Sequence, residues 1–359
     1  MDRRKFIKSV SVGAIAGGAA LGAAGNASAA RKIKWKMVTT WPKNFPGLGT
    51  GANNLARLIN EMSGGRMKVK VYGAKELVPP FEIFDAVSSG TAQMGHGAAY
   101  YWKGKSEAAQ FFAAVPFGLN AQEMNAWLYH GGGMKLWEET YKPFGLIPTA
   151  AGNTGVQMAG WFNREINTVA DLKGLKMRIP GLGGEVLKQA GGTPVSLPGG
   201  EIFTSLKTGA IDATEWVGPY NDLAFGLHKA AKYYYYPGWH EPGTTLECFI
   251  NEKAFKKLPD DLQVIVKQAC RIANQDMLAE YTARNNTALD TLVNKHKVQL
   301  RKLPDDVLKK LKSLSDEVVS DVASKDAMSK KVFESFVKFR NQAKDWHDIS
   351  ERAYLNARA

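Results

Sequence analysis

Strand-like and helix-like segments alternate along the first part of the chain. Residues 32–40 carry apolar Ile33, Trp35 and Met37 at every second position, which is the period of a half-buried strand. The alternation continues with a helix over 47–62, a strand over 67–72, a helix over 79–89 and a strand over 92–99. Strands separated by helices predict an α/β fold in which helices cover a largely parallel sheet.

The same alternation begins again after residue 153. We expect strands over 176–179, 193–197 and 213–217, separated by helices over 183–190 and 200–208. F-E-I-F-D-A-V-S-S-G-T-A-Q-M (81–94) aligns with G-E-I-F-T-S-L-K-T-G-A-I-D-A (200–213), a register that sets Glu215 and Trp216 opposite His96 and Gly97. The repetition predicts two similar α/β lobes.

A further strand over 244–251 would return the chain to the first lobe. We therefore expect lobe I to comprise 30–153 and 244–258, and lobe II to comprise 154–243. Two crossings between lobes form a hinge, and ligands favour the cleft at such an interface.

The remaining segment, 259–359, is predicted to consist of helices that pack on the lobes. One long helix is expected from Asp260 towards Asn294, another from Leu303-Pro304-Asp305, and a last one over 327–357. The last helix has an aromatic face that includes Phe333, Phe336 and Trp346. That face could pack on its own lobe or mediate a homodimer.

The first residues are typical of an export signal. Arg3-Arg4 precedes a mildly apolar run, and Ala27-Ser28-Ala29 offers small residues for cleavage. The paired arginines favour a twin-arginine signal over 1–29, although a plain secretory signal has similar features. Both readings export the protein, and we expect a periplasmic product cleaved after Ala29.

The charge of the chain indicates a solvated basic surface. The formal net charge is +13, and about +10 remains after the four cations and one anion of the signal are removed. Because the lysines are spread among acidic residues, without a dense arginine tract, we expect no nucleic-acid partner. The two cysteines, Cys248 and Cys270, have no zinc-site spacing, and their patterns favour two separately buried thiols over a bridge.

Two predicted strands of the second lobe end in residues suited to binding an acid. Arg178 ends one strand before Pro180-Gly181, and open α/β sheets bind ligands at the carboxyl ends of their strands. A guanidinium can grip a carboxylate with two parallel hydrogen bonds. Glu215 and Trp216 end the next strand, where a carboxylate needs either Arg178 or a cation as its partner. A surface arginine and a core tryptophan are the plainer alternatives.

Gln157 and Glu241 extend this set of oxygen donors. The Gln157 amide could face Arg178 or offer an oxygen to a hard cation, and Glu241 follows Trp239-His240. Two carboxylates, an amide oxygen and a backbone carbonyl suit Na⁺ or Ca²⁺ better than zinc. The segment from Asn153 to Glu241 has no obvious nucleophile.

Several long segments of the sequence resemble those of a known family of transport receptors. N-T-G-V-Q-M-A-G-W-F (153–162), R-E-I-N-T-V-A-D-L-K-G-L-K-M-R (164–178), I-D-A-T-E-W-V-G-P-Y (211–220) and Y-Y-Y-Y-P-G-W (233–239) are similar to the periplasmic receptors of TRAP transporters of the DctP type. The likeness covers essentially the whole mature chain and is closest to the branch that binds 2-oxo acids. The resemblance implies a two-lobed periplasmic binding protein fold with a hinge and a helical C-terminal extension.

The resemblance also implies roles for individual residues. Arg178 would grip the carboxylate of a small 2-oxo acid such as pyruvate, and Tyr100, Tyr101 and Asn153 would line the pocket. A cation, Na⁺ or alternatively Ca²⁺, would bridge to the ligand, held by Gln157, Glu215, the Trp216 carbonyl and Glu241. The expected partners are the small and large integral-membrane TRAP subunits, and in this branch the C-terminal helices can mediate a homodimer.

Other functions remain open at this level. The segments Gly181–Gly184 and Trp239–Pro242 depart from the branch pattern, which leaves the length of the ligand open. A lactate receptor that uses calcium, a ligand sensor, and an exported lyase or isomerase with Glu215 as base are the alternatives. We expect a receptor and not an enzyme.

Overall fold

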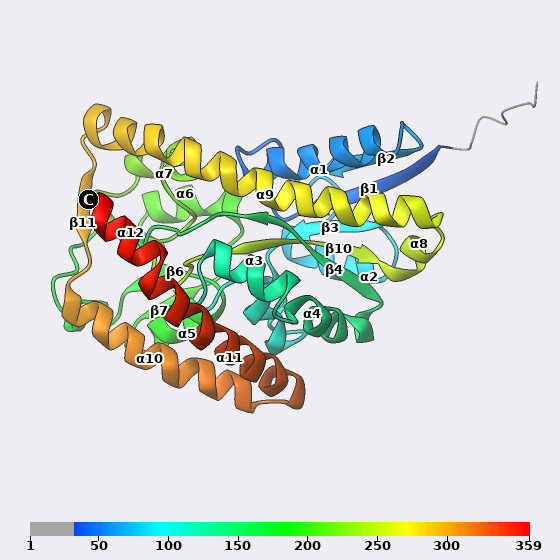
Figure 1. Cartoon of the computed structure of the whole chain (residues 1–359). Helices are drawn as coiled ribbons and strands as arrows, with labels where there is room; N and C mark the ends of the chain where they lie inside the picture. Colours follow the sequence, from blue (N-terminus) through cyan, green and yellow to red (C-terminus); the bar gives the residue numbers. More distant parts are fainter. Residues whose placement is uncertain (1–31) are drawn as a thin grey trace, which may run out of the picture. The chain divides into compact units, whose positions relative to one another are not determined.

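The structure, a computed structural model, describes residues 32–359, and the expected signal peptide lies outside them. Within this range two β-sheets are surrounded by helices, as Figure 1 shows. No helix of this range is both long and apolar enough to cross a membrane. The α/β class expected from the alternating pattern is confirmed.

The first sheet has the strand order β2-β1-β3-β10-β4. β1 runs parallel to β2 and β3, whereas β10 runs antiparallel to β3 and β4. All seven residues of β10 are buried, as expected for a strand covered on both faces. The strands are β1 (Ile33–Thr39), β2 (Met67–Tyr72), β3 (Met94–Gly97), β4 (Leu146–Asn153) and β10 (Thr245–Asn251).

The second sheet has the order β11-β9-β5-β8-β6-β7. β6 is parallel to β7 and β8, β5 is antiparallel to β8 and β9, and β11 is parallel to β9. The strands are β5 (Gly160–Phe162), β6 (Lys176–Arg178), β7 (Thr193–Val195), β8 (Ala213–Thr214), β9 (Tyr233–Tyr236) and β11 (Gln299–Lys302).

The two sheets share one topology, as the internal repeat predicted. The order β2-β1-β3-β10-β4 corresponds to β7-β6-β8-β5-β9, with the same parallel and antiparallel neighbours. In both sheets a helix leads into the third strand, and a glycine with positive φ follows that helix: Gly90 at 87° and Gly209 at 75°. His96 of β3 therefore corresponds to Glu215, which follows β8.

Helices cover the sheets through apolar faces. In α1, the buried residues Leu48, Ala52, Leu55 and Ile59 recur every three or four positions and form one stripe. This stripe and α9 pack on the first sheet. The helices before the C-terminal segment are α1 (Leu48–Met62), α2 (Ile83–Ser88), α3 (Ala121–Tyr129), α4 (Gly133–Tyr141), α5 (Gly181–Gln189), α6 (Gly199–Lys207), α7 (Pro219–Phe225) and α8 (Glu252–Lys256).

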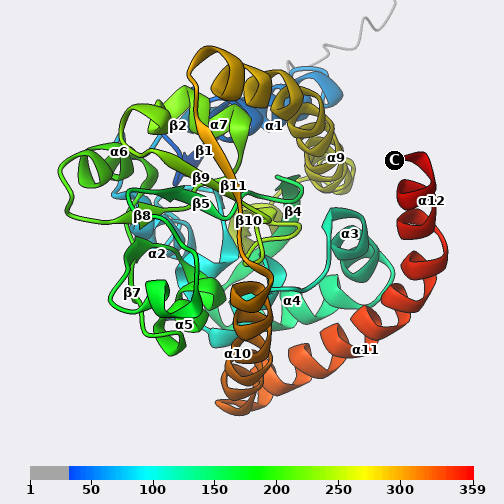
Figure 2. The ribbon, with the colours of Figure 1, turned by 90° about the vertical axis from the view of Figure 1, so that its left-hand side faces the viewer.

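The C-terminal segment is mostly helical but contributes one strand. It comprises α9 (Asp260–Asp290), α10 (Asp305–Ser324), α11 (Ala327–Ile349) and α12 (Glu351–Arg358), with β11 between α9 and α10. β11 pairs with β9 and so belongs to the second sheet, which the expectation of helices alone missed. α10 packs on α5, α11 packs on α3 and α4, and α12 continues past them along the outside (Figure 2).

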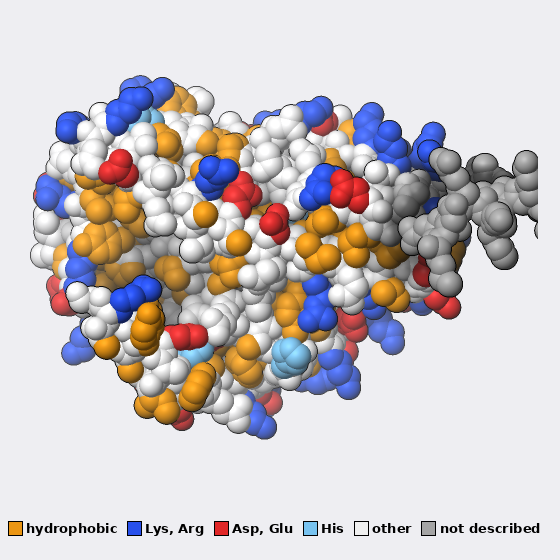
Figure 3. All heavy atoms as spheres, turned by 45° about the horizontal axis from the view of Figure 1, so that its top comes forward, with side chains coloured by type: hydrophobic (Ala, Val, Ile, Leu, Met, Phe, Trp, Pro, Cys, Tyr) orange, Lys and Arg blue, Asp and Glu red, His pale blue; other side chains and the backbone are white. Residues whose placement is uncertain are grey.

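The aromatic face of the last predicted helix divides between core and surface. Phe336 is buried against Phe111 and Trp127, whereas Trp346 is 62% exposed. Cys248 and Cys270 are both free and buried. On the face drawn in Figure 3, basic and acidic side chains are dispersed and do not gather into one basic tract.

Candidate functional site

The candidate site lies where the carboxyl ends of parallel strands from both sheets meet. Arg178 is the last residue of β6, and Glu215 directly follows β8. Tyr100 and Tyr101 lie in the short helical turn Ala99–Trp102 that follows β3 of the first sheet. The meeting of strand ends explains how residues distant in sequence come together.

Arg178 is a fully buried cation with partners from both sheets. Its side chain is 1% exposed, and its guanidinium pairs with the Glu215 carboxylate. Nε donates to the Leu197 carbonyl at 3.2 Å, and Nη2 donates to the Tyr101 hydroxyl at 3.3 Å. The Trp216 ring centre lies 5.2 Å from the guanidinium carbon, within cation–π range. Burial lowers the pKa of Arg178, but the neighbouring Glu215, Tyr101, Tyr100 and Glu241 together outweigh this and keep the pKa above its ordinary value.

Glu215 sits between Arg178 and a histidine. The strand expected over 213–217 ends at Thr214, so Glu215 lies beyond it and is free to face the site. One carboxylate oxygen contacts Arg178, and the other, Oε2, lies 3.5 Å from His240 Nε2. Both side chains are 1% exposed. Among residues 32–359, Oε2 has no hydrogen-bond partner.

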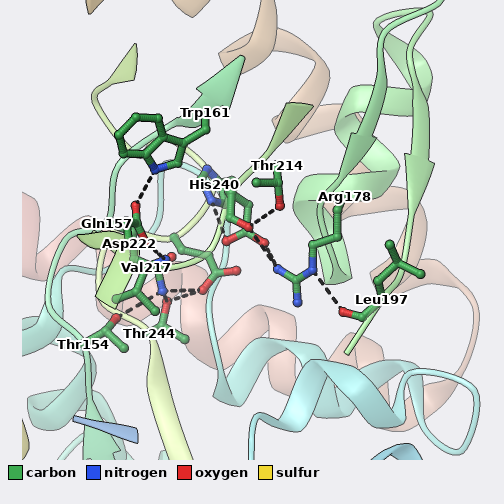
Figure 4. Close-up of polar contacts among 12 residues, drawn as sticks. Thr154, Gln157, Trp161, Arg178, Leu197, Thr214, Val217, Asp222, His240 and Thr244 are labelled. Carbon is green, nitrogen blue, oxygen red and sulfur yellow. Dashed lines mark hydrogen bonds and ion pairs between the residues drawn. The ribbon is translucent and has the colours of Figure 1, made fainter. Parts of the chain in front are cut away.

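Gln157 and Glu241 form a second buried pair beside the first. Figure 4 shows Gln157 with its hydrogen-bond partners Thr154 and Thr244. Gln157 Nε2 donates to Glu241 Oε2 at 2.8 Å, and the Thr244 hydroxyl donates to the same oxygen at 2.6 Å. Burial and the nearby negative charge of Glu215 raise the pKa of Glu241 to about 7. The other amide atom, Gln157 Oε1, is buried without a hydrogen-bond partner in the described range.

These residues form a set of oxygen donors that fits a hard cation. Glu215, His240 and Glu241 each offer one ligand atom, and these atoms lie within 4.8 Å of one another. Gln157 Oε1 and Glu215 Oε2 are buried acceptors left without a partner within residues 32–359, and such atoms are costly unless something binds them. Carboxylate and amide oxygens are ligands that Na⁺ and Ca²⁺ accept.

His240 is the residue that the sequence did not single out. As one of six histidines without metal-site spacing it carried no signal, and only the fold brings it to Glu215. Its place directly before Glu241 was the available clue.

The remaining expected residues lie around this cluster. Tyr101 contacts Arg178. Tyr100 packs closely on Gly181, because a Cβ added at Gly181 would lie 3.0 Å from the Cβ of Tyr100. Both tyrosines line a hollow of about 490 Å³ with Ile179 and Gly181. Asn153, at the end of β4, donates to the Gly243 carbonyl at 3.1 Å, so its amide joins the two segments that cross between the sheets.

A buried carboxyl behind the site holds the segment that follows β8. Asp222 accepts hydrogen bonds from the Trp161 indole at 3.0 Å and the Val217 amide at 3.3 Å (Figure 4). It also accepts one from the Tyr234 hydroxyl at 2.7 Å. Burial raises the pKa of Asp222 to about 7. The bond to Val217 fixes the backbone two residues after Glu215.

The chain is similar to known solute-binding proteins in two sequence comparisons. Residues 37–326 match the family profile described as bacterial extracellular solute-binding protein, family 7 (DctP). The chain is 46% identical to a monocarboxylate 2-oxoacid-binding periplasmic protein of Nostoc sp. PCC 7120, over 90% of this chain and 88% of that protein.

Two solved structures extend the comparison. A TRAP periplasmic solute-binding protein from Pseudoalteromonas atlantica with bound sodium and pyruvate is 44% identical, with a TM-score of 0.88 over 90% of this chain and 99% of that chain. One from Colwellia psychrerythraea with bound calcium and pyruvate is also 44% identical, with a TM-score of 0.88 over 91% of this chain and 99% of that chain.

Proposed function

Because the chain belongs to the DctP family of bacterial extracellular solute-binding proteins, we propose that it is the solute receptor of a TRAP transporter. Its ligand is a small 2-oxo monocarboxylate of the pyruvate type, bound together with a cation. The observation that carries this proposal is the buried Arg178 beside two carboxylates, with two buried acceptor atoms that lack partners among the described residues.

The side chains divide into two roles. Arg178 grips the ligand carboxylate, and Tyr100, Tyr101 and Asn153 line the pocket. Gln157, Glu215, the Trp216 carbonyl and Glu241 hold the cation, which supplies a positive charge that bridges the protein to the acid. Na⁺ and Ca²⁺ both suit this donor set, and similar proteins have been solved with each ion and pyruvate.

We further propose that the ligand is enclosed by hinged lobes, with lobe I formed by 30–153 and 244–258 and lobe II by 154–243. The crossings fall between β4 and β5 and between β9 and β10, and the hydrogen bond from Asn153 to Gly243 ties them together. The segment 259–359 braces both lobes, since α9 packs on the first sheet and β11 joins the second.

The partners follow from the family. The receptor delivers its ligand in the periplasm to the small and large membrane subunits of the transporter, for uptake driven by sodium. A homodimer through the C-terminal helices is supported by apolar side chains on α11 and α12 that are about half to three-quarters exposed: Trp346, Ile349, Tyr354 and Leu355. A twin-arginine signal would export the chain.

Calorimetry with purified protein tests the receptor proposal. We expect one-to-one binding of pyruvate in the presence of Na⁺ or Ca²⁺, weaker binding of lactate, and loss of binding in Arg178→Ala. Arg164→Ala, at an exposed arginine, is the matched control and should bind normally. Absence of heat with every short 2-oxo and 2-hydroxy acid would refute the proposal.

The same protein distinguishes a receptor from an enzyme. We propose that it releases its ligand unchanged. Prolonged incubation followed by NMR of the small molecules should return the acid intact, whereas a lyase or isomerase with Glu215 as base would convert it.

A further inference from the structure

We propose that Glu215 occupies Arg178 in place of the ligand carboxylate until a cation is present, so that binding of the acid depends on the cation. This inference rests on the receptor function proposed above. It concerns the order in which one site is filled.

Most of the hydrogen-bond donors of Arg178 are already occupied. A guanidinium has five N–H donors. Four of them are already used: by Leu197, by Tyr101, and twice at Nη1 by the carboxylate and the carbonyl of Glu215. A carboxylate held by two parallel hydrogen bonds needs two N–H groups on one edge. An incoming acid can obtain that edge only if the Glu215 carboxylate leaves it.

Once displaced from Arg178, the Glu215 carboxylate has an alternative place beside the other oxygen donors. Its Oε2 and Gln157 Oε1 are buried acceptors without a donor in the described part of the chain. Together with Glu241 they form a group of oxygen acceptors that a cation would complete. When a cation is bound there, Glu215 exchanges one positive partner for another and Arg178 becomes available.

The exchange requires little movement beyond one side chain. The Glu215 amide donates to the Arg178 carbonyl at 3.2 Å, and the Thr214 hydroxyl donates to the Glu215 carbonyl at 2.8 Å, so the backbone is held on both sides. The guanidinium is held by Leu197 and by the Trp216 ring. A rotation of the Glu215 side chain therefore suffices.

Charge explains why the cation must accompany the acid. Without a cation, a bound acid would add a third carboxylate beside Glu215 and Glu241, and among the described ion pairs only Arg178 offers these carboxylates a permanent positive charge. Burying a carboxylate without a positive partner costs free energy and therefore weakens binding of the acid. With a cation, Glu215 and Glu241 have a positive partner of their own, and Arg178 serves the acid.

The test measures linkage in the wild-type protein. Pyruvate is titrated by calorimetry into protein stripped of metal in sodium-free buffer, and again with added Ca²⁺ or Na⁺. We expect the affinity for pyruvate to rise at least about tenfold with the cation, within the range of about 5- to 150-fold usual for coupled sites. Because such coupling is reciprocal, pyruvate should raise the affinity for Ca²⁺ by the same factor.

Two variants separate the proposed exchange from simple loss of a ligand. Glu215→Gln removes the charge that competes for Arg178, so its affinity for pyruvate without cation should exceed that of the wild type, with little further gain from Ca²⁺. Glu241→Gln removes one negative charge from the cation site but keeps the pair of Arg178 and Glu215, so its cation-free affinity should stay low. Circular dichroism confirms folding. If either variant fails to fold, absence of linkage in the wild type still overturns the inference.

The outcomes distinguish this inference from the receptor function. Equal affinity for pyruvate with and without cation in the wild type would overturn the inference and leave the receptor function intact. Glu215→Gln that behaves like Glu241→Gln would also overturn it. Failure of every short acid to bind under any condition would instead overturn the receptor function.

Discussion

The buried carboxyl of Glu247 predicts that the protein loses stability as the pH rises. Glu247 lies in the fully buried strand β10 and accepts hydrogen bonds from the Trp102 indole and, at 2.8 Å, from the Tyr141 hydroxyl. Burial raises the pKa of Glu247 from 4.5 to about 8, although both hydrogen bonds act in the opposite direction. Between these two values the folded protein keeps a proton that the unfolded chain has released.

The sign and size follow from proton linkage. Since the folded state binds the extra proton, the free energy of unfolding falls by about 1.4 kcal/mol per pH unit across that window. Over the whole window the contribution of this one group is on the order of 5 kcal/mol, a large part of the stability of a folded domain. The contribution is complete below the unfolded pKa and is lost as the pH rises towards about 8.

Glu247→Gln isolates this effect. The glutamine carbonyl can accept from Trp102 and its amide can donate to the Tyr141 oxygen, so both hydrogen bonds are kept without a titrating group. We expect urea unfolding of ligand-free protein from about pH 5 to about pH 8 to show that the free energy of unfolding of the variant rises relative to that of the wild type by roughly 1.4 kcal/mol per pH unit. Glu252→Gln, a partly exposed glutamate five residues away, is the control and should follow the wild type. Parallel curves for wild type and Glu247→Gln would refute the reasoning.

Three further predictions concern the site and its surroundings. Gly238→Ala would bring a Cβ to 2.1 Å from the Gln157 carbonyl oxygen, so we expect the protein to lose about 1–3 kcal/mol of stability and to bind the acid more weakly. Gly200→Ala is the control, because a Cβ there meets nothing within 4 Å, and it should leave the melting temperature unchanged. Asp222→Ala leaves a buried indole and a buried hydroxyl without their acceptor and should cost at least about 1–3 kcal/mol in urea unfolding, with Asp222→Asn recovering part of it. Pyruvate and Ca²⁺ together, at about a hundred times the dissociation constant, should stabilise the protein by about 2.7 kcal/mol, and a chelator should reverse the gain; an unchanged melting temperature would contradict ligand binding.

Several strands and helices of the two lobes were predictable because burial imposes a local period on them. In β1 and β2 the alternation of Trp35, Met37, Met67 and Val69 with lysines fixed the strand bounds to within a residue. β11 could not be predicted in this way. Its four residues are all exposed, so no apolar period marks it, and only its pairing with β9 makes it a strand.

The candidate site was predictable where a residue type stands at the end of a strand. Arg178 and Glu215 were identified on that ground, and the structure pairs them. Gln157 was expected either at Arg178 or at a cation, and its amide hydrogen-bonds Glu241, an arrangement that depends on the crossing segments and not on local sequence. His240 depends on the same tertiary arrangement, because a histidine without spacing to other ligands gives no local signal.

The burial of the two cysteines has a practical consequence. Cys248 and Cys270 are the only cysteines of the chain, and both are 0% exposed. Cysteines introduced at the surface would therefore be the thiols that a maleimide dye reaches in the folded protein, without removal of the native pair. Lys75 and Glu201 form an ion pair of 2.8 Å between the segment that follows β2 and helix α6. Dyes at these two positions would therefore report by energy transfer on the opening that the proposed hinge predicts.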